Sequence, residues 1–426
     1  MGEAIVKVLN KESNKTQSDE KIVSILTFKL TILAKSFYQM NELQAFLQAI
    51  ATCQTTNEPA FLATVVNTQG STYRKPGARM LMNSKGRMVG TISGGCLEND
   101  VFERTQQVMS GKPIVVKYDT TSQEDIIWGL GLGCNGVVQV LIERVDFDNE
   151  LSPFAFLSKC LYYKQQVVVA TVFGVVGKVK VKVGDRLILH DHTDISNIED
   201  PNLSLAILTD AQAAQCKNHS CIKTYHLSTG SAEVFIEVIQ PPTSLVIFGA
   251  GHDAVPVAHF AKALGWNVTV VDSRANTATH QRFPCVDNII LTRPETAAQQ
   301  VCVNARTVAV VMTHNYLHDL EILKMLLKST ANYIGVLGSK QRSERLLQDL
   351  DPESTYTQAQ LQRLYAPIGL NIGADTPEEI AIAIIAEIQA VLANRKGGLL
   401  RESEIPIHPR HDNHITVVSY KEYASI

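Results

Sequence analysis

Hydrophobic residues in the first third of the chain recur with helical spacing and then in short runs typical of strands. Leu43, Phe46, Leu47 and Ile50 have the spacing of one helix face. A run rich in small and β-branched residues at 60–67 predicts a strand. The same reasoning predicts strands at 78–83, 87–92, 114–118 and 136–144 and a helix at 97–109. We therefore expect one α/β unit over residues 40–145.

The pattern is weaker between residues 146 and 242. It predicts a helix at 154–164 and strands at 166–172, 178–183, 186–189 and 235–239. We expect this part to be a connecting α/β segment or an extension of the first unit. His190, Asp191 and His192 follow one another there, but successive residues of an extended chain point apart, whereas a metal needs convergent ligands. A surface turn is the preferred interpretation of this triplet.

The strongest fold signal begins at residue 245. An uninterrupted apolar run, Leu245 to Phe248, is typical of a strand buried on both faces. It is followed by a GxGxxA pattern over residues 249–254, a predicted helix and a second predicted strand. Asp272 comes 21 residues after Gly251 (272 minus 251), where a ribose-binding acid is expected. These features predict a Rossmann-type unit with four dinucleotide-binding residues: Gly249, Gly251, Ala254 and Asp272.

Strands and helices continue to alternate up to residue 396, which predicts a doubly wound parallel sheet over 243–396. Right-handed crossovers would place its ligand crevice at the carboxyl ends of the strands. The further strands are predicted at 288–291, 307–312 and 333–337, and the helices at 295–301, 317–328, 340–349, 357–364 and 377–393. We expect residues 1–39 to be a poorly ordered leader and residues 397–426 to be a tail with little organisation.

Composition excludes several classes of protein. The 426 residues are 45% hydrophobic and 19% charged, as in an ordinary globular protein, and the formal net charge of -3 argues against a general nucleic-acid binder. No run is long and apolar enough to predict a membrane span. The eight cysteines show no CxxC spacing, so we expect reduced thiols and a cytoplasmic location.

Two cysteines lie in glycine turns. Residues 93–98 read Ser-Gly-Gly-Cys-Leu-Glu, so Gly94 and Gly95 make a turn that places Cys96 at the start of a predicted helix. Free backbone N–H groups and the helix dipole favour an anion there, which suits a functional thiolate. Cys134 lies in the second turn, Gly-Leu-Gly-Cys-Asn-Gly at 131–136. A disulfide between the two cysteines, a shared soft-metal site and two structural turns all remain open.

Two further groups of polar residues are candidates for binding. Arg74 and Lys75 lie in a donor-rich loop at 68–77, which suits a phosphate or another oxyanion but equally suits a solvated turn. His314 and His318 are four residues apart beside Asp319, but no third metal ligand is evident. We therefore interpret His314 as a polar residue that lines the crevice of the Rossmann-type sheet.

Taken together, these segments resemble the XdhC/CoxI family, which are accessory proteins for molybdenum hydroxylases such as xanthine dehydrogenase. The resemblance covers roughly residues 40–395, and the segment 146–240 fits it less distinctively. The matching stretches are 70–77, 93–98, 248–253, 312–319, 334–339, 366–370 and 375–379.

The resemblance implies a chaperone that binds molybdenum cofactor, promotes its sulfuration and delivers it to an apo-hydroxylase. Its implied partners are that apo-enzyme and a cysteine desulfurase. Carried over by motif, Cys96 and Cys134 become candidates for the cofactor site, and Cys96 for a contact with molybdenum. The second turn has Asn135 where relatives often have glycine, which makes its role less certain. We also expect a homo-oligomer, because two halves of one site could come from different chains.

Two other functions remain open. An NAD(P)-dependent oxidoreductase would use the Rossmann residues, with His252 or His314 as acid or base and Arg274 beside a 2′-phosphate. A scaffold would recruit a hydroxylase and a sulfurtransferase without holding the cofactor. Binding of dinucleotides and of the cofactor separates the three.

Overall fold

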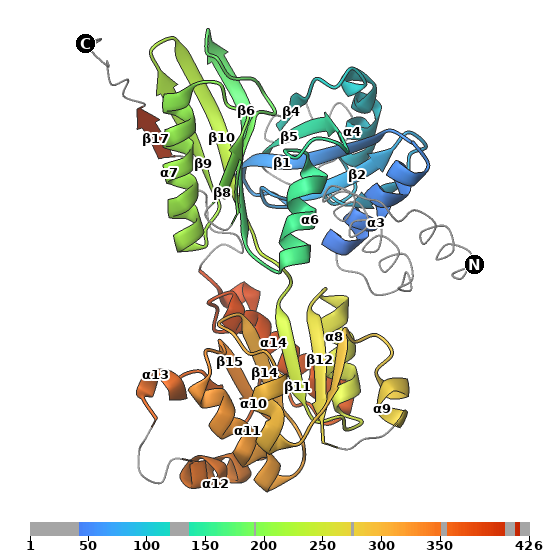
Figure 1. Cartoon of the computed structure of the whole chain (residues 1–426), viewed down its shortest axis with the longest axis vertical. Coiled ribbons are helices and arrows are strands. Elements are labelled where there is room, and N and C mark those ends of the chain that lie inside the picture. Colours follow the sequence, from blue (N-terminus) through green and yellow to red (C-terminus); the bar gives the residue numbers. More distant parts are fainter. Residues whose placement is uncertain are drawn as a thin grey trace, which may run out of the picture. The chain divides into compact units, whose positions relative to one another are not determined.

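The structure is a computed structural model that describes residues 42–119, 136–190, 193–273, 277–350, 356–404 and 414–417 (Figure 1). The chain divides into two compact units, the first ending at Ala155 and the second beginning at Phe156. The described residues form three sheets, one in the first unit and two in the second. Among the described helices, none is both long and apolar enough to span a bilayer.

The first sheet has the predicted elements and is antiparallel, in the order β3-β2-β1-β5-β4. Buried side chains on one face of β1 pack with those of β2, β5 and α4 to form its core. The elements are α3 (Glu42–Thr55), β1 (Ala60–Gly70), β2 (Arg79–Asn83), β3 (Met88–Gly90), α4 (Glu98–Arg104), η1 (Thr105–Val108), β4 (Ile114–Asp119) and β5 (Gly136–Arg144).

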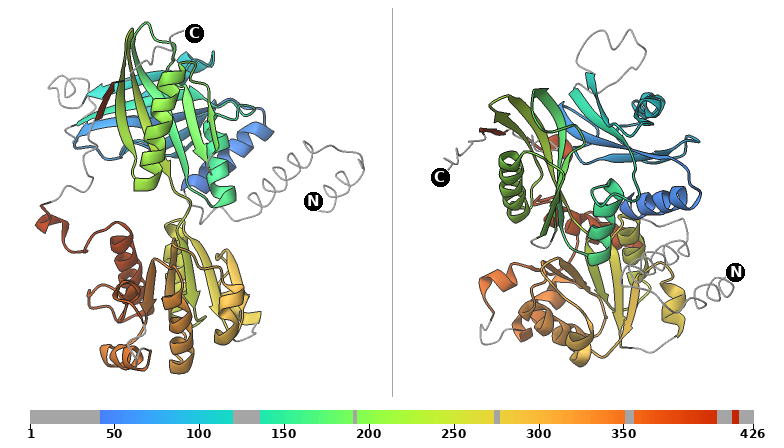
Figure 2. Two further views of the ribbon diagram at one scale, coloured as in Figure 1. Left: turned by 60° about the vertical axis from the view of Figure 1, so that its left-hand side comes forward. Right: turned by 45° about the horizontal axis from the view of Figure 1, so that its top comes forward.

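The second sheet has the order β17-β9-β10-β6-β7-β8, and helix α7 lies along one of its faces (Figure 2). The chain forms α6 (Pro153–Tyr163), β6 (Val167–Gly177), β7 (Arg186–His190), β8 (Thr193–Ser196), α7 (Pro201–Lys217), β9 (Cys221–Leu227) and β10 (Gly230–Ile239). The sequence analysis did not predict α7, although Asp200 caps it by accepting from the N–H groups of Asn202 and Leu203.

Two predictions for this part of the chain were wrong. The strand predicted at 178–183 does not form, because β6 runs on to Gly177 and the chain then turns. The Gly184 N–H donates to Val172 O, and the Lys182 N–H donates to the Asp185 carboxylate, so both bonds close a loop.

The tail also contributes structure, since β17 (His414–Val417) pairs in parallel with β9. His190 ends β7, while Asp191 and His192 lie outside the described residues.

The second sheet repeats the first. Apart from the added strand β17, its order β8-β7-β6-β10-β9 matches the order β3-β2-β1-β5-β4 of the first sheet. Each copy begins with a helix and has a helical segment between its third and fourth strands. Thr64 pairs with Arg79, and Thr171 pairs with Arg186, at one offset of 107 residues (171 minus 64 and 186 minus 79). Gly70 pairs with Gly136 in the first copy, as Gly177 pairs with Gly230 in the second.

Finer details of the two copies also agree. One extra residue bulges after Val65 in β1 and after Val172 in β6. The N–H groups of Val65 and Val172 both donate across to the strand-end loop, at 2.9 Å in each copy. Each copy also has a tyrosine hydroxyl that donates to an aspartate on the crossing helix: Tyr118 to Asp100 and Tyr225 to Asp210. We conclude that residues 153–239 are a second copy of the first fold.

The third sheet is parallel, in the order β13-β12-β11-β14-β15-β16. This is the predicted Rossmann arrangement. Strands β11 to β13 follow one another toward one edge of the sheet and β14 to β16 toward the other, so the strand order reverses between β11 and β14. Its elements are β11 (Ser244–Phe248), α8 (Ala254–Ala263), β12 (Asn267–Asp272), α9 (Thr277–Arg282), β13 (Asn288–Leu291), η2 (Pro294–Thr296), α10 (Ala297–Gln300), β14 (Thr307–Val311), α11 (Tyr316–Lys328), β15 (Tyr333–Val336), α12 (Lys340–Leu350), α13 (Gln358–Leu361), β16 (Leu364–Tyr365) and α14 (Pro377–Leu392).

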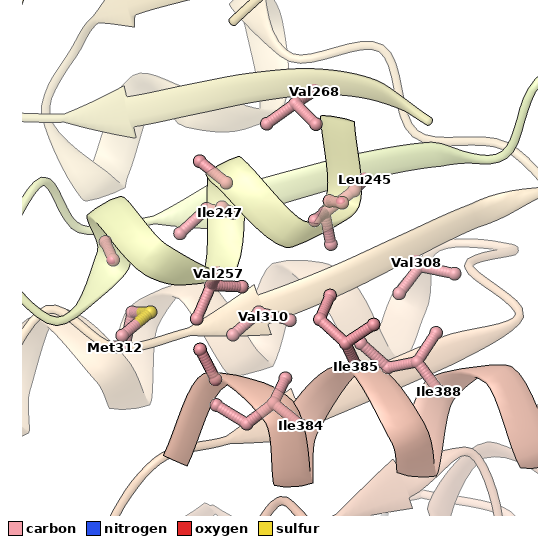
Figure 3. Packing of buried hydrophobic residues seen from close by; sticks show 14 of the residues in the cluster. Leu245, Ile247, Val257, Val268, Val308, Val310, Met312, Ile384, Ile385 and Ile388 are labelled. Carbon is pink, nitrogen blue, oxygen red and sulfur yellow. The ribbon is translucent and has the colours of Figure 1, made fainter. Parts of the chain in front are cut away.

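Successive side chains of each strand point to opposite faces of this sheet, so both faces are apolar and helices cover both. Leu245 and Ile247 of β11 share one core with Val257 of α8 and with residues of α14, namely Ile384, Ile385 and Ile388 (Figure 3). Val246 and Phe248 point to the opposite layer, which includes α11 and α12. The helix predicted at 357–364 is shorter than expected, because Leu364 already pairs with Ile334 in β16.

Candidate functional site

The turn that carries Cys96 is closed by its own acidic residue. The Glu98 carboxylate accepts from the N–H groups of Ser93 at 2.9 Å, Leu97 at 3.1 Å and Ile92 at 3.3 Å, and from the Ser93 hydroxyl. Ser93 Oγ in turn accepts from the N–H groups of Gly95, Cys96 and Leu97, each at 3.2 Å. The expectation of free N–H groups for an outside anion was therefore wrong.

These contacts also fix the charge of Glu98. Burial opposes its ionisation, but donation from the Ser93 hydroxyl and from backbone N–H groups outweighs burial and holds the pKa of Glu98 below its ordinary range. Glu98 thus remains ionised at neutral pH and braces the turn. From the sequence, Glu98 was interpreted as a first-turn acid that complements the helix dipole, and its bonds to the turn were not predicted.

Cys96 lies half-buried on this braced turn. Its Sγ is 3.5 Å from Ser93 Oγ, and buried Leu97 anchors the next position in the core. Gly94 and Gly95 are exposed, and Gly95 has a φ of 109°, a conformation that favours glycine. The turn therefore presents the thiol at the surface with a fixed backbone.

The loop at 70–77 reaches both the cysteine turn and the start of β5. The ring of Tyr73, 65% exposed, lies against Gly94, with ring atoms 3.9 Å from where a Cβ would be. A Cβ on Gly136 would lie 2.6 Å from the carbonyl oxygens of both Gln69 and Ser71, so only glycine allows this close approach. Arg74, half-buried, lies in the same loop. Cys134, two residues before Gly136, lies outside the described residues.

Comparison of the two copies separates residues that the fold needs from residues that it does not. At the offset of 107, Arg79 corresponds to Arg186 and Gly77 to Gly184, so these belong to the shared fold. Tyr73 instead corresponds to the exposed Lys180, and Arg74 to the buried Val181. The cysteine turn has no counterpart, because in the second copy Asp200 caps α7 directly after a short loop.

The second copy also lacks a long connection before its last strand. Only residues 228 and 229 separate β9 from β10, whereas residues 120–135 separate β4 from β5 in the first copy. That first-copy segment contains Cys134. The second copy thus keeps the fold without side chains equivalent to Tyr73, Arg74 and Cys96, and without the longer connection whose sequence includes Cys134.

The Rossmann-type sheet has a cavity of about 160 Å³ at the carboxyl ends of β11, β12 and β14. Gly249 lies in its wall with a φ of 119°, and a Cβ there would approach Met312 O to 2.4 Å. The Asp272 side chain is almost fully buried and accepts from the Ala250 N–H at 2.7 Å. The lining residues are Phe248, Gly249, Val271, Asp272, Ser273, Thr292, Pro294, Ala297, Thr313, Asn315, His318 and Ile322.

His314 is positioned beside this cavity by an unusual backbone. Its φ is 60°, and the following Asn315 caps α11 through the N–H groups of Leu317 and His318. His314 Nε2 lies 2.8 Å from Asp253 Oδ2, which links the loops after β14 and β11. His318, not His314, lines the cavity. No group of three or more His, Cys, Asp or Glu residues within the described ranges is arranged to hold a metal ion.

From the sequence, Tyr73 was only one of the polar residues of the candidate loop at 68–77, and Asp253 was given no role. Tyr73 is 23 residues from Cys96 (96 minus 73), so only the fold shows that they belong to one surface. The signal for Asp253 was available, because an acid beside a glycine loop is unfavourable for a phosphate. Arg274 lies outside the described residues.

Comparison with known proteins assigns the chain to a family. A family described as the XdhC and CoxI family matches residues 53–119, and the XdhC Rossmann domain matches residues 245–388. A protein from Bacillus subtilis, named as a probable subunit of xanthine dehydrogenase, is 36% identical over 334 residues, which cover 78% of this chain and 92% of that protein. The chain belongs to the XdhC and CoxI family.

Other relatives agree with this assignment. The molybdenum cofactor insertion chaperone PaoD of Escherichia coli is 22% identical over 78% of this chain and 83% of its own length. A crystal structure described as a xanthine dehydrogenase from Bacillus halodurans matches with a TM-score of 0.66 at 30% identity, covering 86% of this chain and 98% of that one. The two matched regions of the XdhC and CoxI family contain Cys96 and the Rossmann glycines, and neither includes the second copy.

Proposed function

We propose that this protein binds molybdenum cofactor on its first sheet, assists its sulfuration and hands it to a molybdenum hydroxylase such as xanthine dehydrogenase. One observation carries the proposal: the Tyr73–Arg74 loop and the Cys96 turn meet on one surface, and the second copy lacks their chemistry while keeping the fold. Family membership supports it, as do relatives named for cofactor insertion and for xanthine dehydrogenase. The protein acts as an accessory chaperone without turnover of its own.

The chemistry of this surface suits such a cargo, which combines a pterin ring, a phosphate and a soft metal centre. An exposed tyrosine ring offers a face for stacking a flat heterocycle, as aromatic side chains do for nucleobases. The guanidinium of Arg74 forms charge-assisted hydrogen bonds with phosphate. The sulfur of Cys96 is a ligand type that soft metals prefer, and Cys134 is a second candidate.

Two further partners belong to this proposal. Sulfuration needs a sulfur donor, for which we propose a cysteine desulfurase that docks beside Cys96. Cys96 is only half-buried, which supports access to its thiol by a second protein. A homo-oligomer in which two chains complete one site also belongs to the proposal.

Paired variants test the site. Equilibrium binding of molybdenum cofactor to the full chain is measured for Cys96→Ser and Tyr73→Ala, and for two matched controls in the second copy. Lys180→Ala changes the position that corresponds to Tyr73, and Cys216→Ser removes an exposed thiol from α7. We expect each first-copy variant to lower affinity by about tenfold or more, since one such contact contributes about 1.4 kcal/mol or more.

The controls are expected to bind the cofactor as the wild type does. A second readout is delivery, measured as activity gained by an apo-hydroxylase. Equal affinity and equal delivery for wild type, Cys96→Ser and Tyr73→Ala would remove the first sheet as the binding surface.

A further inference from the structure

The glycine pattern after β11 implies a dinucleotide, and the residues present do not fit its pyrophosphate. In a Rossmann unit the second glycine leaves room for the pyrophosphate to approach the backbone. Here that glycine is Gly251, and a Cβ on it would lie 2.4 Å from Asp253 Oδ1. The room left by the missing side chain is therefore filled by a carboxylate of the protein itself.

The Asp253 carboxylate is held in this place. Asp253 precedes α8, yet its side chain makes no capping hydrogen bond to the helix. Its Oδ2 is instead 2.8 Å from His314 Nε2, and His314 Cδ2 lies 3.6 Å from the Cβ position of Gly251. A diphosphate at the start of α8 would meet this negative charge, in a place where Rossmann proteins offer it N–H groups.

The adjoining cavity is suited to a different ligand. Its size, about 160 Å³, is close to that of a protein cavity of about 150 Å³ that accommodates a single benzene ring. In the part of the chain that the structure describes, no lysine or arginine lines it. The lining residues with polar side chains are Asp272, Ser273, Thr292, Thr313, Asn315 and His318, of which Asp272 is the one acid.

These groups match a neutral ring that carries hydroxyl groups. Asp272 ends the second strand of the sheet, the position from which an acid binds ribose hydroxyls in Rossmann proteins. We infer that this cavity binds the ribose of a neutral nucleoside and that Asp253, held by His314, excludes dinucleotide diphosphates. The cavity belongs to the Rossmann-type sheet alone, so nucleoside binding there is independent of the cofactor site proposed on the first sheet.

Titration calorimetry on the full chain tests this inference, with adenosine, cytidine and NAD⁺ as probes. We expect at least one nucleoside to bind the wild type, and NAD⁺ to bind it at least about tenfold more weakly. Asp253→Gly should raise the affinity for NAD⁺ by about tenfold or more and leave that for the nucleoside within about threefold. Glycine is tolerated at the start of a helix, so this variant is expected to fold.

Two further variants complete the design. Asp253→Asn keeps the size of the side chain and removes its charge, so it should gain part of the NAD⁺ affinity if repulsion is the cause. Glu378→Gln removes an exposed carboxylate from the first turn of α14 and should bind all probes as the wild type does. Tight binding of NAD⁺ to the wild type would overturn the inference, and so would failure of both nucleosides to bind it.

Discussion

At the scale of single residues, Cys96 is defined by its neighbours more than by its position in a helix. The sequence places this cysteine correctly in a glycine turn before α4, because the turn is a local feature. Its surroundings depend on contacts that a local pattern does not contain. Ser93 and Glu98 occupy the N–H groups of the turn, and Tyr73 reaches it from a distant loop. The Cys96 thiol thus lies on a turn whose N–H groups are already hydrogen-bonded, and not beside N–H groups that are free for an anion.

Glu98 should make stability depend on pH. Because its pKa is lowered in the folded state, it stabilises the fold above the ordinary glutamate value of 4.5, and this contribution disappears as the pH falls through the folded pKa. We expect Glu98→Gln to lower the free energy of unfolding by about 1 kcal/mol at pH 7, since a half-buried charged acceptor of several hydrogen bonds is lost. Denaturant unfolding at pH 7 and below pH 4 measures both effects.

Glu103→Gln on the same helix serves as the control, because Glu103 is exposed. It should change stability little at either pH. A Glu98→Gln deficit of the same size at low pH as at pH 7 would show that the carboxylate charge does not brace the turn.

At the scale of elements, the Rossmann-type sheet was predictable and the duplication was not. An apolar strand, a glycine loop and an acid at a fixed distance are all read within about 30 residues of sequence. The two antiparallel copies share topology and register but few identical residues, among them Thr64 and Thr171. Their equivalence therefore becomes visible only when strands distant in sequence are paired.

Helix α7 was missed for a related reason. Its buried residues Leu203, Ile207, Ala211 and Ala214 have helical spacing, but two of the four are small alanines, and Leu205 beside them is exposed. The apolar pattern is consequently weak. Tertiary packing against the second sheet, which no window of sequence contains, stabilises this helix.

A pair of glycines tests how the two copies differ in function. A Cβ on Gly136 would meet the carbonyl oxygens of Gln69 and Ser71, just before Tyr73. In the second copy, a Cβ on Gly230 would meet Val176 O at 2.0 Å. Alanine at either position should lower the free energy of unfolding by about 1–3 kcal/mol, as forced overpacking does. Only Gly136→Ala should also weaken binding of molybdenum cofactor, because only the first loop carries the proposed site.

Thermal unfolding and cofactor titration of both alanine variants provide the comparison, with the titrations done at a temperature where each remains folded. Equal loss of cofactor affinity in Gly136→Ala and Gly230→Ala would show that the second copy takes part in binding. It would also contradict the assignment of the ligand surface to the first copy.

At the scale of the whole molecule, one fold occurs twice, but the glycine-framed cysteine turns occur only in the first copy. The Rossmann-type sheet adds a separate cavity at its carboxyl edge, at the reversal between β11 and β14. The sequence indicated the Cys96 turn and the crevice of the Rossmann-type sheet as candidate sites, but it did not indicate that the Asp253 carboxylate lies against Gly251.

The central claim is that this protein holds molybdenum cofactor, and its most direct test is the content of the purified protein. The full chain is produced in a host that makes the cofactor, and pterin absorbance and molybdenum content are then measured against protein concentration. We predict that pterin and molybdenum copurify with the wild type and fall sharply in Cys96→Ser. A wild-type protein without pterin or molybdenum, even after the cofactor is added, would contradict it.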